Sequence, residues 1–190
     1  MPQPDHIVRM KLPDPDGLDD DIKGYFAKCQ EKLGLVPYVL RAYTGNQEKL
    51  RHFIAFYNEL MLADSGLSKL EREMIAVVVS AANRCYYCLV AHGQAVRQLS
   101  GDPQLGEMMV MNYRVAELSP RQRAMLDYAW KLTSDPHGIG EPDRQALRDA
   151  GFSDADLFDI TDTAAFFNYT NRMAHGLDMM PNPDYHAMDR

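Results

Sequence analysis

The stretch that decides the fold of this 190-residue chain runs from Ser68 to His92 and reads SKLEREMIAVVVSAANRCYYCLVAH. It opens with a capping box, in which the Ser68 hydroxyl and the Glu71 carboxylate satisfy the first free backbone amides of a helix. The run from Glu73 to Val79 is rich in β-branched residues and on composition alone could form a buried strand. Because the capping box comes just before this run, we predict a helix that begins at about Lys69.

Apolar residues at helical spacing predict further helices on both sides of this stretch. The predicted ranges are 18–33, closed by Gly34; 47–63; 85–99, closed by Gly101; 103–112; a helix that opens at Ser119-Pro120; 143–150, closed by Gly151; and a last long helix that opens at Ser153. The sequence contains no convincing alternating strand pattern and no hairpin turn of the Asn-Gly type. The fold class is therefore predicted to be all-α.

Prolines set the N-terminal end of the chain apart from the rest. Residues 1–17 contain Pro2, Pro4, Pro13 and Pro15, a composition that cannot continue a helix and suits an extended arm. At this length one domain is the default. We therefore predict an arm over residues 1–17 and a single helical domain over residues 18–190.

Charge and hydropathy exclude several classes of protein. The chain has 20 Lys and Arg against 27 Asp and Glu, a net charge of -7, so nucleic acid is not an expected partner. The longest apolar stretch, residues 74–82, is far shorter than the about 20 residues that span a bilayer, so no membrane segment is expected. The N-terminus lacks a basic region followed by an apolar one. We predict no secretory signal and a cytoplasmic protein.

The cysteines indicate where the chemistry lies. Cys29, Cys85 and Cys88 are an odd number in a chain with no export signal, which favours thiol chemistry or metal binding over structural disulfides. On a helix, Cys85, Cys88 and His92 share one face, and Cα atoms about 5 Å apart make a reversible Cys85–Cys88 disulfide sterically feasible. About 10 Å of helix rise separates Cys85 from His92, so one zinc ion cannot easily bind all three, although two of them with Glu73 still could. Cys29 lies on an apolar face and is predicted to be core.

Two cues compete over which thiol becomes the thiolate. The start of a helix favours Cys85, whereas a base one turn away, His92, favours Cys88. Glu73 directly precedes the apolar run, and a buried carboxylate there needs a partner, for which His92 is the candidate. Such a pair could move the proton that a thiol must lose. Taken singly, Glu73 could equally be an ordinary first-turn charge and His92 a core histidine.

The spacing of these residues resembles a known family. Glu73, eleven intervening residues, Cys85-x-x-Cys88, three more residues and His92 form a pattern similar to the alkylhydroperoxidase D-like (AhpD-like) branch of the carboxymuconolactone decarboxylase superfamily. The likeness is strongest to its peroxidase-related members. It covers most of residues 20–183, including two further stretches, 33–37 and 167–172.

The resemblance implies an AhpD-like all-α fold that forms homo-oligomers, commonly trimers or hexamers. It also implies that Cys88 attacks a hydroperoxide and that Cys85 resolves the sulfenic acid to a disulfide. His92 and Glu73 would relay the proton, and an external dithiol or protein thiol would restore the pair. No metal and no organic cofactor is implied.

One position departs from the family pattern. The best-known members carry a histidine just before the second cysteine, where this chain has Tyr87, so their relay cannot run identically here. Three other functions stay open. They are a dithiol-disulfide oxidoreductase acting on a protein partner, an acid-base enzyme like the superfamily's lactone decarboxylases, and a non-catalytic oligomeric binding protein or zinc-stabilised module.

Overall fold

The computed structural model describes residues 3–190, and in that part of the chain it contains nine α-helices, four short 3-10 helices and no β-strand. The prediction of an all-α fold is confirmed. The α-helices are α1 (Asp20–Leu33), α2 (Tyr38–Ala42), α3 (Gln47–Leu62), α4 (Lys69–Ala82), α5 (Tyr86–Ser100), α6 (Pro103–Asn112), α7 (Pro120–Ser134), α8 (Glu141–Asp149) and α9 (Asp154–Gly176). The 3-10 helices are η1 (Pro15–Gly17), η2 (Tyr113–Val115), η3 (Pro136–Gly138) and η4 (Pro183–His186).

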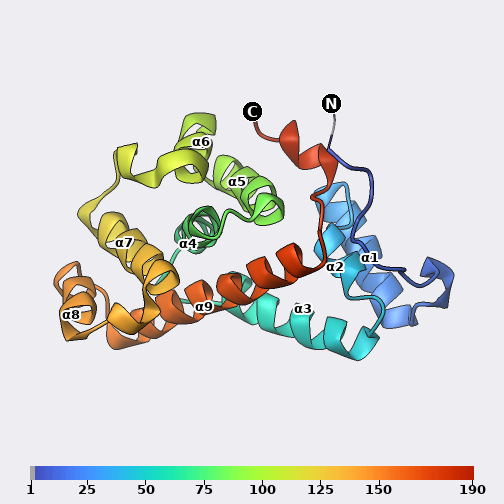
Figure 1. Cartoon of the computed structure of the whole chain (residues 1–190), viewed down its shortest axis with the longest axis horizontal. Coiled ribbons are helices and arrows are strands. Elements are labelled where there is room, and N and C mark those ends of the chain that lie inside the picture. The colour runs from blue at the N-terminus through green and yellow to red at the C-terminus, as the bar shows by residue number, and fades with distance from the viewer. Residues whose placement is uncertain (1–2) are drawn as a thin grey trace.

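Helix α4 lies at the centre of the molecule. The capping box forms as predicted, because Glu71 N–H donates to Ser68 Oγ at 3.2 Å and Ser68 N–H donates to Glu71 Oε2 at 2.8 Å. Every residue from Glu71 to Ser80 is buried, and α5, α7 and α9 pack around the helix, which Figure 1 views nearly end-on. A helix covered on all sides needs apolar residues on all its faces. The β-branched run is therefore a buried helix rather than a strand.

Most helix boundaries lie within two residues of the predicted ones. The first helix begins at Asp20, the second long helix ends at Leu62, and α8 begins at Glu141. Cys85 is the residue that caps α5 and not the first residue inside it. The sequence pattern does not predict α2 or η4, because elements of four or five residues are too short for an apolar period to appear.

A tight turn joins α4 to α5. Cys85 N–H donates to the Ser80 carbonyl at 2.9 Å, and Arg84 N–H donates to the Ala81 carbonyl at 3.1 Å. This pair of hydrogen bonds is a Schellman motif, which requires a left-handed residue just beyond the helix. Arg84 supplies it with a φ of 54°. Cys85 thus closes α4 and opens α5, so its position is set by both helices.

The N-terminal arm packs along the C-terminal segment of the chain (Figure 1). Arg9 N–H donates to the Leu177 carbonyl at 2.8 Å, and Met180 N–H donates to the Ile7 carbonyl at 3.0 Å. Between them Val8 is buried in a small cluster that also contains Cys85 and Cys88. The arm therefore covers the cysteine helix. The division into an arm and a single domain stays a prediction.

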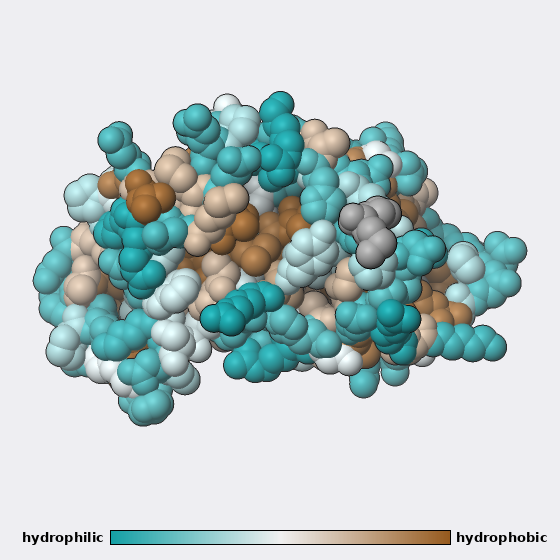
Figure 2. Space-filling view, turned by 45° about the horizontal axis from the view of Figure 1, so that its top comes forward, coloured by the Kyte–Doolittle hydropathy of each residue, from teal (hydrophilic) through white to brown (hydrophobic). Residues whose placement is uncertain are grey.

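Apolar side chains are present on the surface as well as in the core. In Figure 2, hydrophobic residues gather in a hollow near the middle of the face shown, and hydrophilic residues surround it. The most exposed large apolar side chains are those of Met111, Phe158 and Val115, at 80%, 67% and 62%. Within residues 3–190, no helix combines the length and the apolar character needed to cross a bilayer.

Candidate functional site

The four candidate residues come from two adjacent helices. Glu73 projects from α4, Cys88 and His92 project from α5, and Cys85 caps α5. Both cysteines are free thiols and nearly completely buried, with 1% of Cys85 and 2% of Cys88 exposed. The structure thus brings a carboxylate, an imidazole and two thiols into a short stretch of the α4–α5 interface.

Glu73 and His92 form a direct pair. His92 Nδ1 lies 2.7 Å from Glu73 Oε2, and only 13% and 11% of the two side chains is exposed. A carboxylate can only accept a hydrogen bond, so Nδ1 carries the proton and donates it, which leaves Nε2 free to act as a base. Phe167 from α9 packs its ring edge-on against the imidazole, with 4.6 Å between the two ring centroids. Glu73 is therefore not an exposed first-turn charge, and His92 is a largely buried histidine whose partner is Glu73.

The two thiols are electrostatically unequal. A hydrogen bond from the Cys88 thiol, helped by the nearby imidazoles of His175 and His92, lowers the pKa of Cys85 to about 7 against the opposing effect of burial. The thiolate on Cys85, together with burial, raises the pKa of Cys88 well above its usual value. The first charge of the pair therefore forms on Cys85, as the argument from the helix start predicts.

A buried amide and a buried hydroxyl lie behind Cys88. Asn171 Nδ2 from α9 donates to Ser80 Oγ of α4 at 3.0 Å, and the Asn171 amide also hydrogen-bonds the Cys88 sulfur, which acts to lower the pKa of Cys88. The Ser80 hydroxyl gives its own proton to the Ala76 carbonyl at 2.7 Å. Asn83 Nδ2 donates to Asn171 Oδ1 at 2.9 Å and fixes the orientation of the amide. Sequence reasoning does not assign Ser80 or Asn171 to the site. The available signal is that each is a polar residue inside an apolar helix face that is completely buried.

Tyr87 has a structural role at the position where the resemblance leads one to expect histidine. Its side chain is buried, and its hydroxyl accepts a hydrogen bond from Val39 N–H at 3.0 Å. Burial raises its pKa well above the usual value, so it stays neutral. Tyr87 thereby ties α2 to the cysteine helix and takes no visible part in the contact between Glu73 and His92.

Cys29 lies outside this group, whereas His175 lies near Cys85 at its edge. Cys29 is half-buried on α1 and packs against the main core, as predicted, and burial raises its pKa. His175 is exposed at the end of α9, where its Nε2 lies 3.0 Å from the Asn83 carbonyl. Over residues 3–190, no three His, Cys, Asp or Glu side chains are grouped closely enough to hold a metal ion.

Comparison with known proteins finds one family and several similar structures. Residues 47–131 match the carboxymuconolactone decarboxylase family. An uncharacterized peroxidase-related protein from Silicibacter sp. TM1040 is 59% identical, with a TM-score of 0.96 over 100% of both chains. An uncharacterized peroxidase-related protein from Ralstonia eutropha JMP134, described as an alkylhydroperoxidase AhpD core, is 43% identical, with a TM-score of 0.94 over 97% of both chains. The apo debrominase Bmp8 is 15% identical, with a TM-score of 0.79 over 93% of both chains, a likeness of fold alone. No curated protein matches the chain.

Tyr87→Phe tests whether the tyrosine anchors α2. The variant leaves Val39 N–H without its acceptor, and we expect a loss of about 1–3 kcal/mol in the free energy of unfolding. Equilibrium urea denaturation of the reduced protein measures this loss. The matched control is Tyr86→Phe, because the neighbouring ring is 45% exposed and its loss should stay within about 0.5 kcal/mol. Equal effects of the two substitutions would remove the anchoring role.

The unequal thiols predict the pH dependence of alkylation. A lowered pKa means that the thiolate persists down to lower pH, so labelling of Cys85 by iodoacetamide should rise through about pH 7. Labelling of an ordinary cysteine rises through about pH 8.5. Peptide mass spectrometry against pH separates the two thiols, and Cys88→Ala should move the Cys85 midpoint upward because the donated hydrogen bond is gone. A midpoint near 7 on Cys88 in place of Cys85 would contradict this assignment.

Proposed function

The chain belongs to the carboxymuconolactone decarboxylase family and to its AhpD-like, peroxidase-related members, and from this premise we propose that it is a thiol peroxidase. Its substrate would be an organic hydroperoxide, which Cys88 and Cys85 reduce without metal or organic cofactor. The observation that carries the proposal is the 2.7 Å contact between His92 Nδ1 and Glu73 Oε2 beside a pair of free thiols. A carboxylate-oriented imidazole next to a thiol is the arrangement that proton removal from that thiol requires.

In the first half-reaction Cys88 consumes the hydroperoxide. Nε2 of His92 accepts the first proton that the thiol pair loses, and Glu73 stabilises the imidazolium. Transfer of the shared proton from Cys88 to Cys85 moves the thiolate to Cys88, where the Asn171 amide supports the charge. This thiolate attacks the outer oxygen of the hydroperoxide, the O–O bond breaks, and Cys88 becomes a sulfenic acid. The alkoxide that leaves takes the proton from His92 and departs as an alcohol.

In the second half-reaction Cys85 resolves the sulfenic acid. The Cys85 sulfur attacks the Cys88 sulfur, the S–O bond breaks, and the hydroxide leaves as water with the Cys85 proton. The product is a Cys85–Cys88 disulfide, whose formation the short helical spacing of the two residues allows. An external dithiol, either small or on a protein, then reduces the disulfide and is itself oxidised.

A second function is favoured by one specific observation. Cys85, at the start of α5, has its pKa lowered to about 7, which is typical of the attacking cysteine in dithiol-disulfide oxidoreductases. In that case Cys85 would attack a disulfide of a protein partner, and peroxide would be a poor substrate. An acid-base enzyme of the lactone decarboxylase type would use Glu73 and His92 and would keep its activity without Cys88.

The partners and location belong to the same proposal. We propose a cytoplasmic homo-oligomer, a trimer or a hexamer, that binds neither nucleic acid nor membrane. The net charge of -7 supports the absence of nucleic acid. The exposed rings of Phe56 on α3 and of Phe158 and Tyr169 on α9 support self-association, because such side chains are commonly covered in oligomers.

The proposed function is tested by mixing the reduced protein with cumene hydroperoxide and measuring the loss of free thiols over time. We expect rapid formation of a Cys85–Cys88 disulfide, mapped by peptide mass spectrometry. Cys88→Ser should abolish the fast reaction, whereas Cys85→Ser should stop at a Cys88 sulfenic acid that dimedone traps. Fast sulfenylation of Cys85 in Cys88→Ser would reassign the attack. Oxidation no faster than that of free cysteine would contradict the peroxidase function and favour a protein disulfide as the substrate.

The proton relay predicts a second set of rates. Glu73→Gln and His92→Asn should each slow thiol oxidation by about 10²-fold, the lower end of what a positioned base contributes, while the helical circular dichroism stays unchanged. His137→Asn is the matched control, because that side chain is 92% exposed in η3. Normal oxidation rates in both relay variants would show that the pair is not needed to activate the thiol.

A further inference from the structure

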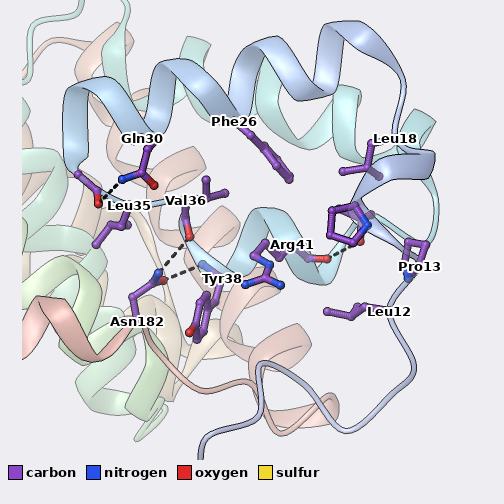
Figure 3. Close-up of a pocket in the computed structure, with 13 residues that line it drawn as sticks. Leu12, Pro13, Leu18, Phe26, Gln30, Leu35, Val36, Tyr38, Arg41 and Asn182 are labelled. Atoms are coloured by element: carbon purple, nitrogen blue, oxygen red, sulfur yellow. Dashed lines mark hydrogen bonds between the residues drawn. The ribbon is translucent and has the colours of Figure 1, made fainter.

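A cavity of about 370 Å³ lies between the N-terminal arm, α1 and α2 (Figure 3). Its volume falls in the range of small-molecule sites, about 300–1,000 Å³. All of its lining residues lie outside the segment 47–131 that matches the family. The wall is mixed, with polar groups and apolar side chains in similar shares, and the apolar part comes from Leu12, Leu18, Phe26, Leu35 and Val36. The cavity therefore offers enough apolar surface to bury part of an organic molecule.

One charged side chain, Arg41 of α2, points into this cavity (Figure 3). It is half-buried, and among residues 3–190 its guanidinium forms no ion pair and donates no hydrogen bond; the Tyr38 ring lies 5.6 Å away. By contrast, Arg51 contacts Asp19 and Asp21, and Arg148 contacts Glu141 and Asp154. A guanidinium without a counter-charge is available to pair with an anion that enters the cavity.

Two other polar side chains of the cavity hydrogen-bond within the fold, and the Tyr38 hydroxyl, which forms no hydrogen bond among residues 3–190, is neutral. Gln30 Nε2 donates to the Gly34 carbonyl at 2.7 Å, and Thr44 Oγ1 donates to the Arg41 carbonyl at 2.7 Å. None of the residues that line the cavity is acidic. Arg41 is therefore the group that determines which ligand charge fits.

The cavity adjoins the cysteine site. Leu12 and Tyr38 line the cavity and also pack against the cluster that contains Cys85 and Cys88. Asn182 fixes the shared wall, since its Oδ1 accepts from Tyr38 N–H at 2.8 Å and its Nδ2 donates to the Val36 carbonyl at 3.0 Å. The hydrogen bond from Val39 to Tyr87 ties the same wall to α5. A ligand in the cavity thus lies against the residues that cover the thiols.

We infer that this cavity binds amphipathic carboxylates, with the carboxylate on Arg41 and the apolar chain against the walls of the arm and α1. A guanidinium matches a carboxylate with two parallel hydrogen bonds, which a neutral head group cannot form. The inference rests on the proposed function for its consequence: the preferred substrates are hydroperoxides of carboxylic acids that carry an apolar chain. Arg41 is then a specificity-determining residue that does not touch the reacting atoms.

Calorimetric titration of the reduced full-length protein with octanoate and octanamide tests the site independently of catalysis. The two probes share an apolar chain and differ in charge. Octanoate should bind at least about tenfold more tightly, since hydrogen bonds to charged groups contribute about 1.5–3 kcal/mol. Arg41→Gln should weaken the binding of octanoate by at least about tenfold and leave the affinity for octanamide unchanged. Arg41→Lys keeps the charge, so its affinity for octanoate should fall less. The matched control is Arg144→Gln on α8, at the far end of the molecule (Figure 1), which should change neither.

Kinetics connect the site to the reaction. Arg41→Gln should raise the KM for a fatty-acid hydroperoxide by about tenfold and leave the KM for cumene hydroperoxide unchanged. Equal binding of octanoate and octanamide, or an Arg41→Gln variant that binds octanoate normally, would overturn the inference. Charge-selective binding without any peroxide-driven thiol oxidation would keep the carboxylate site and remove the peroxidase function. Turnover of cumene hydroperoxide without octanoate binding would keep the peroxidase function and remove the carboxylate site.

Discussion

The hydrogen bond from Cys85 N–H to the Ser80 carbonyl, 2.9 Å long, closes the turn on which the candidate site depends. With Arg84 in the left-handed region, the chain reverses within three residues, and α5 must pack directly against α4. This reversal sets Glu73 beside His92. The same turn holds Cys85 at the start of α5, where free backbone amides favour a thiolate.

Several of the polar groups buried near the site are paired with one another, whereas Arg72 Nε and Thr163 Oγ1 have no hydrogen-bond partner within residues 3–190. Glu73 has His92, and Asn171 has both Ser80 and Asn83. Such groups are costly when unpaired and specify a single arrangement when paired. The environment of the two thiols therefore comes from three helices, α4, α5 and α9, and a change in the packing of any one would alter their pKa values.

The proposed reaction site and the proposed ligand site come from two regions of the chain. The segment that matches the family, residues 47–131, contains Glu73, both cysteines and His92. The cavity with Arg41, and the arm that covers the thiols, come from segments outside it. Tyr87 joins the two regions, because its ring packs with the cysteines and its hydroxyl holds Val39. The two proposed sites are therefore built from different segments but share a wall through Tyr87.

The sequence by itself determined the features that depend on neighbours within about four residues: the capping box at Ser68, the start of the last helix at Ser153, the glycine stops, the helical class, and the spacing of the cysteines and His92. It named Glu73 and His92 as candidate partners but left their contact open. Only the tertiary structure decided that contact, the place of Asn171 behind Cys88, and the exposure of Arg41 to a cavity. The physical reason is that these contacts join helices far apart in the sequence, so their distances follow from packing and not from local propensity.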